Sequence, residues 1–468
     1  MNLWKLFGSC AKALRSAFSD NRTFDQFVRV CAGMCTRVDH AGVTSIVRAL
    51  DLDPSCYGSL LHLFKSHAWS AESLTKSWIG WVMRVFGDYK VNGRYVLIAD
   101  GIKAPREGRK MPAVKSLHQE SASNTKPEFI MGHSFQAIGL LAKHGPVAWS
   151  VPLAARIHEG IKFSNRDKRT LHNKLGTMFR EVTLAMNTKV GKYLIADAYY
   201  ACASMVQELF ESGDDLVVRV KSNVVAYRRA QQRPVNKRGR PKKYGEKVKL
   251  MALFKDKPRF TTGTISGYGN EETEVEFYSE DLLWKPVGRI VRFVLVIYPN
   301  KGRCILMTTD LSLDPLQVIE MYTKRFKIEE SFKQSVHTIG AFDYHFWLKP
   351  MERIKRGSGN QHLHRESQEY REAVKEKIES YNRFVAIGAV AQGFMQYLST
   401  YFPAEVYALS PWLRTRTKSG HPSEATVSQA LRDALPEFRA STTDTSALRK
   451  ILTECQRENR SSAVRKSA

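Results

Sequence analysis

The sequence lacks the segments that mark membrane and secreted proteins. No stretch reaches the ~18 consecutive apolar residues that a membrane-spanning helix needs. Residues 1–18 alternate apolar residues with Lys5, Lys12 and Arg15, so they lack the continuous apolar core of a secretory signal. We therefore expect a cytoplasmic protein without a membrane partner.

Cysteine is also scarce, and its spacing fits neither a disulfide framework nor a zinc site. The seven cysteines form an odd set without a Cys-x-x-Cys pair. Cys31 and Cys35 are close in the chain, but no histidine pair lies at the spacing of a zinc finger. Free thiols in a reducing compartment are the expectation, and zinc is not expected.

Acidic residues are few relative to basic ones. Only 46 Asp and Glu face 72 Lys and Arg, which gives a formal net charge of +26. Such a charge indicates a polyanionic partner, and nucleic acid is favoured over a membrane surface because no apolar span is present. The 468 residues, 43% of them hydrophobic, predict a folded globular protein of about three domains.

The amino-terminal region has the apolar pattern of helices. Residues 43–50 and 57–65 predict two short helices around the polar segment 51–55. Such a pair can form a helix-turn-helix that reads duplex DNA. Any helical bundle contains similar pairs, so the pattern leaves both interpretations open.

The next region predicts alternating strands and helices. Apolar runs predict strands at 95–99, 128–141, 147–153, 193–196 and 216–220, and helical patterns lie at 166–186 and 203–211. The order is therefore three strands, a helix, a strand, a helix and a strand. This is the order of elements in an RNase H-like α/β domain.

A basic segment with short strand patterns follows. Between Arg219 and Lys249 there are twelve Lys or Arg and one acid, Glu246, and β patterns separated by turns continue to Thr309. Residues 350–380 are highly charged, residues 383–403 are apolar and helical, and the tail from about Ala440 is expected to be poorly ordered.

The segment 322–333 places polar and apolar residues on separate faces of one helix, which begins at Asp314-Pro315. Four polar side chains fall within about 80° of one another: Tyr322, Arg325, Glu329 and Lys333. The adjoining apolar face consists of Met321, Ile328 and Phe332. A carboxylate flanked by cations and a phenol suits a metal ion beside a phosphate. A solvated face with i,i+4 ion pairs fits the same spacing, so this helix alone does not decide between them.

Two aspartates follow buried-type strands. Asp100 comes after the apolar run 95–99, and Asp197 comes after the run 193–196. Either aspartate alone is weak evidence, because Asp at a strand end usually caps a turn or helix. Together with Glu329, they would be three carboxylates able to hold two divalent cations about 3.5 to 4 Å apart, an arrangement that hydrolyses or transfers phosphodiesters.

Four short blocks occur together in this chain: Ala-Asp-Gly at 99–101, Ala-Asp-Ala-Tyr at 196–199, Thr-Thr-Asp-Leu-Ser-Leu at 308–313, and Tyr322-x-x-Arg325-x-x-x-Glu329. Over roughly residues 90–345 the chain resembles bacterial insertion-sequence transposases of the DDE class, in the insertion-sequence-four, transposon-five-like family. The resemblance implies that Asp100, Asp197 and Glu329 are the catalytic, metal-binding triad. It also implies that Tyr322 and Arg325 grip the DNA backbone near the cut.

The resemblance further implies cofactors, partners and domain roles. Two Mg²⁺ ions are expected, which Mn²⁺ can replace. The implied partners are DNA, as transposon terminal inverted repeats and as target, and a second copy of the chain in a homodimeric synaptic complex on the bacterial nucleoid.

The fold class predicted is α/β, with an RNase H-like catalytic core, a β-rich insertion before the last acidic residue, and helical regions at both ends. The expected parts are a helical amino-terminal region for DNA-end recognition (1–90), the first part of the core (91–221), the basic β-rich insertion (222–303), the second part of the core with the motif helix (304–348), and a helical carboxyl-terminal region for dimerisation with a disordered tail (349–468).

The chain departs from the family pattern at two positions. The signature lysine seven residues after the glutamate is Val336, although Lys333, one turn nearer, can present a similar charge. The family's base-flipping tryptophan is absent from positions 303–304, and Trp284 upstream is a candidate substitute. The departures put a hairpin-intermediate route in doubt but not the metal chemistry.

Two basic segments outside the motif helix are further candidates for DNA binding. Arg238-Gly239-Arg240-Pro241, followed by Lys242 and Lys243, resembles the core of an AT-hook, which fits a narrow minor groove. A plain basic linker is the alternative, and in either case the segment should contact the DNA backbone. Residues 101–115 would line the substrate channel or form a solvated loop.

Two histidines lie near Asp100 in the expected fold, His118 and His133. Each could act as a general base or as a further metal ligand. A hydrogen-bonded structural role is favoured, because no second histidine stands at ligand spacing in a helix.

These features predict a DNA transposase that cleaves element ends by metal-dependent hydrolysis and joins the freed 3′ hydroxyl to target DNA. One alternative is an RNase H-like, structure-specific DNA nuclease without strand transfer. Another is a non-catalytic DNA-binding regulator. The separate helical region and the basic insertion argue against the first, and three intact carboxylates argue against the second.

Overall fold

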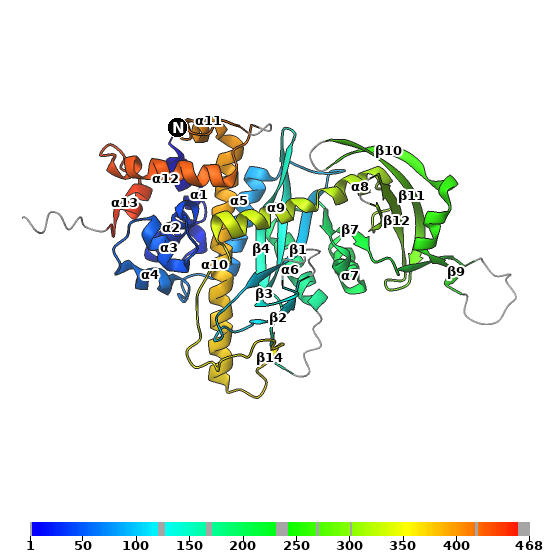
Figure 1. The fold of residues 1–468 in the computed structure, drawn as a ribbon, viewed down its shortest axis with the longest axis horizontal. Coiled ribbons are helices and arrows are strands. Elements are labelled where there is room, and N and C mark those ends of the chain that lie inside the picture. Colours follow the sequence, from blue (N-terminus) through cyan, green and yellow to red (C-terminus); the bar gives the residue numbers. More distant parts are fainter. Residues whose placement is uncertain are drawn as a thin grey trace, which may run out of the picture.

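The computed structural model describes residues 2–119, 127–164, 171–230, 242–267, 271–299, 302–416 and 420–456, without the side chains of 171–173. Helices from the two ends of the chain gather on one side, a sheet occupies the middle, and further strands lie on the other side (Figure 1).

Helices come first and last along the chain, and most of the strands lie between them. The helices are α1 Leu3–Lys12, α2 Asn21–Thr36, α3 Gly42–Ala49, α4 Cys56–Leu63, α5 Ala71–Phe86, α6 Leu171–Ala185, α7 Ala203–Ser212, α8 Pro315–Thr323, α9 Phe326–Gln334, α10 Gln368–Tyr401, α11 Pro403–Ala408, α12 Glu424–Ala440 and α13 Ala447–Thr453. The strands are β1 Tyr95–Pro105, β2 Lys115–His118, β3 Phe129–His144, β4 Val147–Ile157, β5 Ile161–Lys162, β6 Lys192–Ala196, β7 Asp215–Val220, β8 Val225–Arg229, β9 Tyr244–Lys249, β10 Thr261–Ser266, β11 Glu272–Trp284, β12 Arg289–Tyr298, β13 Gly302–Thr308 and β14 Gln361–His362.

The central strands form an RNase H-like sheet. Strands β4, β3 and β1 are antiparallel neighbours, and β1, β6 and β7 run parallel to one another. Helix α6 connects β4 to β6, and α7 connects β6 to β7. The predicted order of three strands, helix, strand, helix and strand is confirmed, because long apolar runs of this kind can be buried on both faces only in a sheet that helices cover.

The strands of the basic segment extend this sheet. Strand β13 pairs antiparallel with β7, and β12, β11, β8 and β9 follow in that order, with β10 on the outer part of β11. The β-rich character predicted after residue 221 is thus confirmed. Within the described residues, the added strands join the core sheet where β13 pairs with β7.

Helices from both ends of the chain pack into one body. The Trp4 indole donates to the Leu431 carbonyl at 3.0 Å, and the buried Arg29 guanidinium donates to the Ile451 carbonyl at 3.0 Å. Helix α10 runs the length of this body and also packs on β4 (Figure 1). The Trp78 indole of α5 bonds to the Pro152 carbonyl of β4 at 2.8 Å, which fixes the helical body to the edge of the sheet.

The expectation of a poorly ordered tail from about Ala440 is wrong for the part that the structure describes. Residues 447–453 form α13, whose Leu448, Ile451 and Leu452 are buried. Ser446 caps this short helix by accepting the Arg449 amide. A short apolar patch in a polar tail gave too weak a pattern, and packing on α2 supplies the stabilisation. Residues 457–468 lie outside the described residues.

The structure bears on membrane-spanning helices and on the state of the cysteines. None of the described helices is both long and apolar enough to cross a bilayer. All seven cysteines are free thiols, and Cys10, Cys31 and Cys35 are buried in the helical body.

Candidate active site

Strand register brings the two predicted aspartates side by side. Strand β1 pairs in parallel with β6 from Tyr95 opposite Lys192 to Ile98 opposite Ile195. Continuing this register by two residues places Asp100 level with Asp197 on neighbouring chain segments, which in a sheet lie ~4.8 Å apart. Asp100 does not end its strand as expected, since β1 runs on to Pro105 beyond the end of β6.

Asp197 stands where the chain leaves the sheet. Its carboxylate accepts the Tyr199 amide at 2.9 Å and so caps the short 3₁₀ turn Ala198–Tyr200. The buried Tyr200 that follows donates its hydroxyl to Gln136 on β3. The turn therefore fixes the backbone of Asp197 while its side chain stays partly exposed at the sheet edge.

The predicted motif helix is divided in two. Asp314 caps α8 by accepting the Leu316 amide at 2.8 Å, as expected, but α8 ends at Thr323 and α9 begins at Phe326. At the junction the backbone bonds change to i,i+3, with the Arg325 amide donating to the Tyr322 carbonyl at 3.0 Å. This tighter turn places Arg325 at the head of α9, directly over β1.

Arg325 joins two of the three predicted carboxylates. One guanidinium nitrogen lies 2.6 Å from Asp100 Oδ2, and the other lies 2.5 Å from Glu329 Oε1. Asp100 and Arg325 are mostly buried, with side chains 18% and 19% exposed, whereas Glu329 is 38% exposed. The polar face of the helix is therefore turned toward the aspartates, and the i,i+4 ion pair is present as part of the same arrangement.

Asp197 and Glu329 both act electrostatically on Asp100. Burial raises the pKa of Asp100 to about 6, opposed by the Arg325 guanidinium and reinforced by the negative charges of Asp197 and Glu329. The negative charges of Asp197 and Glu329 that reinforce this rise also favour the binding of a cation near Asp100.

The residues fit a divalent cation by donor chemistry but are not gathered into a formed metal site. Carboxylate oxygens are the ligands that Mg²⁺ and Mn²⁺ prefer. Yet among the residues that the structure describes, no three His, Cys, Asp or Glu side chains are grouped so that they could hold an ion. The guanidinium of Arg325 lies between Asp100 and Glu329 and contacts one oxygen of each carboxylate.

Tyr322 lies beside this cluster on α8. Burial raises its pKa to about 12, with opposing effects from the nearby Arg325 and Arg219 cations and a further rise from Asp197. Arg219 projects from β7, is exposed, and has no ion pair with any described carboxylate. Sequence reasoning missed Arg219, because it was read as the first residue of the basic segment. In β7 its side chain faces solvent, whereas the neighbouring Val218 and Val220 are buried.

Lys333 and Val336 follow Glu329 along α9 and the π-helical turn Ser335–Ile339. Lys333 is exposed and, with Glu329, lines a cavity of about 630 Å³ between α9, the start of β4 and the start of α12. Val336 packs against the hydrophobic core. The cation available after the glutamate is therefore Lys333.

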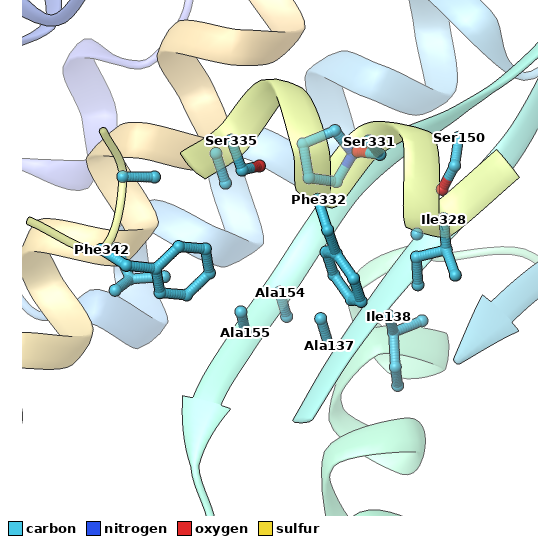
Figure 2. Close-up of a pocket in the computed structure, with 15 residues that line it drawn as sticks. Ala137, Ile138, Ser150, Ala154, Ala155, Ile328, Ser331, Phe332, Ser335 and Phe342 are labelled. Atoms are coloured by element: carbon cyan, nitrogen blue, oxygen red, sulfur yellow. The ribbon is translucent and has the colours of Figure 1, made fainter. Parts of the chain in front are cut away.

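Helix α9 sits closely on the sheet because the strands beneath it carry small residues. Ile328 and Phe332 point from α9 toward Ala137 of β3 and Ala154 of β4 (Figure 2). The cavity left between them is only about 20 Å³, which is about the space of one water molecule. The apolar face predicted for this helix is confirmed, since Met321 and Ile328 are buried and Phe332 packs against the same cluster.

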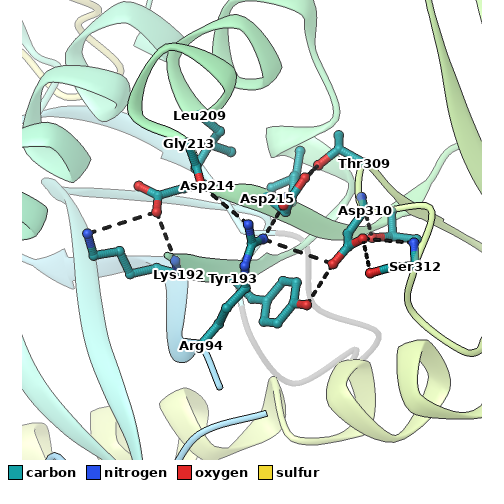
Figure 3. A network of polar contacts seen from close by, with 12 residues as sticks. Arg94, Lys192, Tyr193, Leu209, Gly213, Asp214, Asp215, Thr309, Asp310 and Ser312 are labelled. Carbon is teal, nitrogen blue, oxygen red and sulfur yellow. Dashed lines mark hydrogen bonds and ion pairs between the residues drawn. The ribbon is translucent and has the colours of Figure 1, made fainter. Parts of the chain in front are cut away.

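A polar network holds the start of α8 to the core sheet. Arg94, just before β1, lies between Asp215 of β7 and Asp310, which follows β13 (Figure 3). The Tyr193 hydroxyl of β6 donates to Asp310 at 2.7 Å, and the Thr309 hydroxyl donates to Asp215 at 2.6 Å. These contacts, which we call the Asp310 network, fix residues 308–313, the segment that leads into the motif helices.

The AT-hook-like segment is only partly described by the structure. Arg238 and Arg240 of the AT-hook-like segment lie outside the described residues, whereas Lys242 and Lys243 are exposed at the entry to β9.

The prediction that Trp284 could replace the base-flipping tryptophan is wrong, because Trp284 is only 4% exposed and belongs to the hydrophobic core. An alternating β pattern does not reveal which face of an added strand is covered.

His133 has a structural role. It is fully buried, its Nδ1 accepts the Tyr344 hydroxyl at 2.7 Å, and its Nε2 donates to the Pro112 carbonyl at 2.8 Å. Burial, with the nearby Arg106 cation, lowers the pKa of His133 to about 3, so the ring stays neutral. His118 is half exposed and lies 3.7 Å from Glu128. The favoured structural interpretation is confirmed for His133.

A family of known proteins matches more than half of this chain. Residues 13–263 match the family described as DDE superfamily endonuclease, which is more than half of the chain and includes Asp100 and Asp197 but not Glu329. The chain therefore belongs to the DDE superfamily of endonucleases. No curated protein matches it.

Solved structures also match, among them the cryo-EM structure of a piggyBac transposase synaptic complex with hairpin DNA. The identity is 10%, the match covers 94% of this chain and 77% of that chain, and the TM-score is 0.37. A likeness of this extent does not assign an activity. The membership in the DDE superfamily rests on the sequence match.

Proposed function

We propose that this DDE superfamily protein is a DNA transposase of the insertion-sequence-four, transposon-five-like kind, with Asp100, Asp197 and Glu329 as its catalytic triad. The observation that carries the proposal is the contact of Arg325 with Asp100 and Glu329, which brings the catalytic helix onto the strand that lies beside Asp197. Family membership supplies the class of chemistry, which is cleavage of phosphodiester bonds.

The proposed chemistry assigns a role to each group. Two divalent cations, Mg²⁺ or Mn²⁺, held by the three carboxylates would activate the attacking oxygen and stabilise the leaving oxygen. Arg325 pairs with Asp100 and Glu329, and its guanidinium can turn to a phosphate oxygen when DNA binds. Tyr322 and Arg219 flank the same phosphate, and Lys333 meets the backbone one turn further on.

Transposition adds requirements beyond cleavage. The freed 3′ hydroxyl attacks target DNA, and two element ends must be held together, which favours a homodimer on DNA. In this proposal the helices α3 and α4 take part in recognition of the terminal repeats, and Arg238, Arg240, Lys242 and Lys243 contact the DNA backbone.

Asp197→Asn tests the triad. The variant should lose Mg²⁺-dependent cleavage of element-end DNA by about a thousandfold or more while DNA affinity stays within about twofold, because one ligand of the metals is removed without changing the fold. Asp433→Asn is the matched control, since Asp433 is exposed on α12 and its partner is Gln429. Unchanged cleavage in Asp197→Asn would reject the triad.

A strand-transfer assay separates the transposase from a nuclease of the same fold. Pre-cleaved ends with a free 3′ hydroxyl should join to a supercoiled plasmid when the protein and Mg²⁺ are present. Cleavage without joining would favour the structure-specific nuclease. Imperfect inverted repeats beside the reading frame, bracketed by a short direct duplication, would provide the end sequences to use.

A further inference from the structure

Two loops that leave the catalytic elements are joined to each other. The first loop follows β1, the strand of Asp100, and the second follows α9, the helix of Glu329. The Leu348 amide donates to the Lys110 carbonyl at 2.9 Å, and the Ile354 amide donates to the Arg109 carbonyl at 2.9 Å. We call residues 106–115 and 343–358 together the paired-loop surface.

The paired-loop surface is well anchored. Arg106 donates to the Phe342 carbonyl, and its guanidinium stacks on the buried Tyr344 ring at 4.2 Å. A small apolar cluster beneath the second loop includes Leu348 and Met351 and packs against the start of α10. Because both loops are tied to the same core, the surface keeps a fixed position relative to the catalytic strand and helix.

The exposed charge on this surface is mostly positive and uncompensated. The exposed cations are Arg109, Lys349, Arg353, Lys355 and Arg356, and the exposed acids are Glu107 and Glu352. In the part of the chain that the structure describes, none of these cations lies within 4 Å of a carboxylate, unlike Lys115, which pairs with Glu159 at 2.9 Å. Unpaired cations of one sign on a fixed surface attract a polyanion and can contact its phosphates.

An exposed tryptophan stands among these cations. Trp347 is 60% exposed, whereas the flanking Leu348 is 7% exposed. One edge of the indole abuts Gly108 of the first loop, where an added Cβ would lie 2.9 Å from the ring nitrogen. The ring is therefore held by the backbone along one edge and open to solvent elsewhere. Aromatic rings presented this way beside cations stack on nucleotides.

We propose that the paired-loop surface binds the DNA next to the scissile phosphate. Arg353 and its neighbouring cations contact the phosphates, and Trp347 packs against a base or deoxyribose. The proposal rests on the proposed function for DNA as the substrate, and it adds a binding surface that leads away from the carboxylates along the two elements that carry Asp100 and Glu329.

Charge reversal tests the phosphate contacts in the full-length chain. Affinity is measured by fluorescence anisotropy with a labelled random-sequence duplex over a series of salt concentrations, in the Asp197→Asn background so that the DNA stays intact. Arg353→Glu should bind about tenfold more weakly and reduce the salt slope by ~1 or more. Lys189→Glu has the same change in charge and should change affinity by less than about twofold, because Lys189 precedes β6 and Asp197 follows it, so the two lie at opposite ends of that strand.

The tryptophan is tested with a second exposed tryptophan as control. Trp347→Ala should lower affinity by about 5- to 100-fold with an unchanged salt slope, and Trp347→Phe should retain most of the affinity, because stacking needs a ring and not a charge. Trp412→Ala removes a ring that is 56% exposed, and it should have no effect.

The results separate this proposal from the proposed function. Equal affinities for Arg353→Glu and Lys189→Glu, or for Trp347→Ala and Trp412→Ala, would overturn the paired-loop surface even if Asp197→Asn abolishes cleavage. Weakened binding in Arg353→Glu and Trp347→Ala would support the surface even if cleavage proved not to depend on Asp197.

Discussion

His133 shows how one buried polar residue depends on its partners. The imidazole lies at the centre of an aromatic group, with its ring centroid 5.8 Å from that of Tyr344 and 5.0 Å from that of Tyr381. Both ring nitrogens have partners only if the ring is neutral and carries its proton on Nε2, because Nδ1 must accept from Tyr344. A proton added to Nδ1 would meet a hydroxyl that already donates there and the cation of Arg106.

The protein should therefore lose stability on mild acidification. The folded pKa of His133 is about 3, below the ordinary value of ~6.5 that it regains on unfolding, so its contribution is complete above pH ~6.5 and decreases as the pH falls toward ~3. Only the unfolded chain binds the proton in this window, and the loss is about 1.4 kcal/mol per pH unit. The measurement is urea denaturation at a series of pH values.

His133→Gln should give a shallower pH dependence than the wild type over that window, although it is less stable at neutral pH. Burial also lowers the pKa of His158, to about 4, so His158 destabilises the folded protein on acidification in the same way. The stability of His133→Gln should therefore still decrease with falling pH, but less steeply. His118→Gln serves as the control because His118 is half exposed. Parallel pH curves for the wild type and His133→Gln would contradict the account.

At the scale of elements, the motif helices are positioned from two directions. The apolar face of α9 lies on the small residues of β3 and β4, and the Asp310 network fixes the segment before α8 (Figures 2 and 3). The junction between α8 and α9 then turns Arg325 onto Asp100. Because the two supports belong to different strands of the sheet, loss of either one should shift α9 relative to Asp100 and Asp197.

Asp310→Ala should destabilise the fold by about 2–4 kcal/mol, because Tyr193 and the partly buried Arg94 would lose an anionic partner. Chemical denaturation provides the measurement. Ser312→Ala is the matched control, since it removes only a hydroxyl that donates to the same carboxylate at 2.6 Å, and should cost less than about 1 kcal/mol. Similar losses in the free energy of unfolding for both variants would mean that the Asp310 network does not hold α8.

At the scale of the whole molecule, the two chain ends support each other. Helix α13 is too short to be stable alone and is held by α2, where Arg29 donates to the Ile451 carbonyl and pairs with Glu454 at 2.9 Å. Helix α12 in turn packs on α1, α2 and α10. The helical body is thus closed by contacts between residues more than four hundred positions apart.

Arg29→Ala should release α13. Trypsin should cut faster at Arg449 and Lys450, as followed by mass spectrometry, and the melting temperature should fall, because the buried Ile451 carbonyl and the exposed Glu454 carboxylate lose their donor. Arg22→Ala on the same helix is exposed and should leave the cleavage rate unchanged. Equal cleavage rates in the two variants would show that packing of the apolar residues alone holds α13.

What the sequence determined by itself is local. The strands β1, β3, β4, β6 and β7, the helices around them and the two faces of the motif helix follow from apolar periodicity, which depends on neighbours two to four residues apart. The net charge likewise needs no structure. Composition and spacing were therefore enough to predict the RNase H-like order of elements, and the roles expected of Asp100, Asp197, Arg325 and Glu329 came from the resemblance to a transposase family.

Only the tertiary structure decided how these residues meet. The register of β1 against β6, the turn between α8 and α9, and the contact of Arg325 with Asp100, 225 residues away, arise from packing between distant segments. The same is true of the burial of Trp284, the exposed position of Arg219 near Tyr322, and the joining of the two loops around Trp347. Periodicity along the chain carries no information on such contacts, because they are set by which faces the folded layers cover.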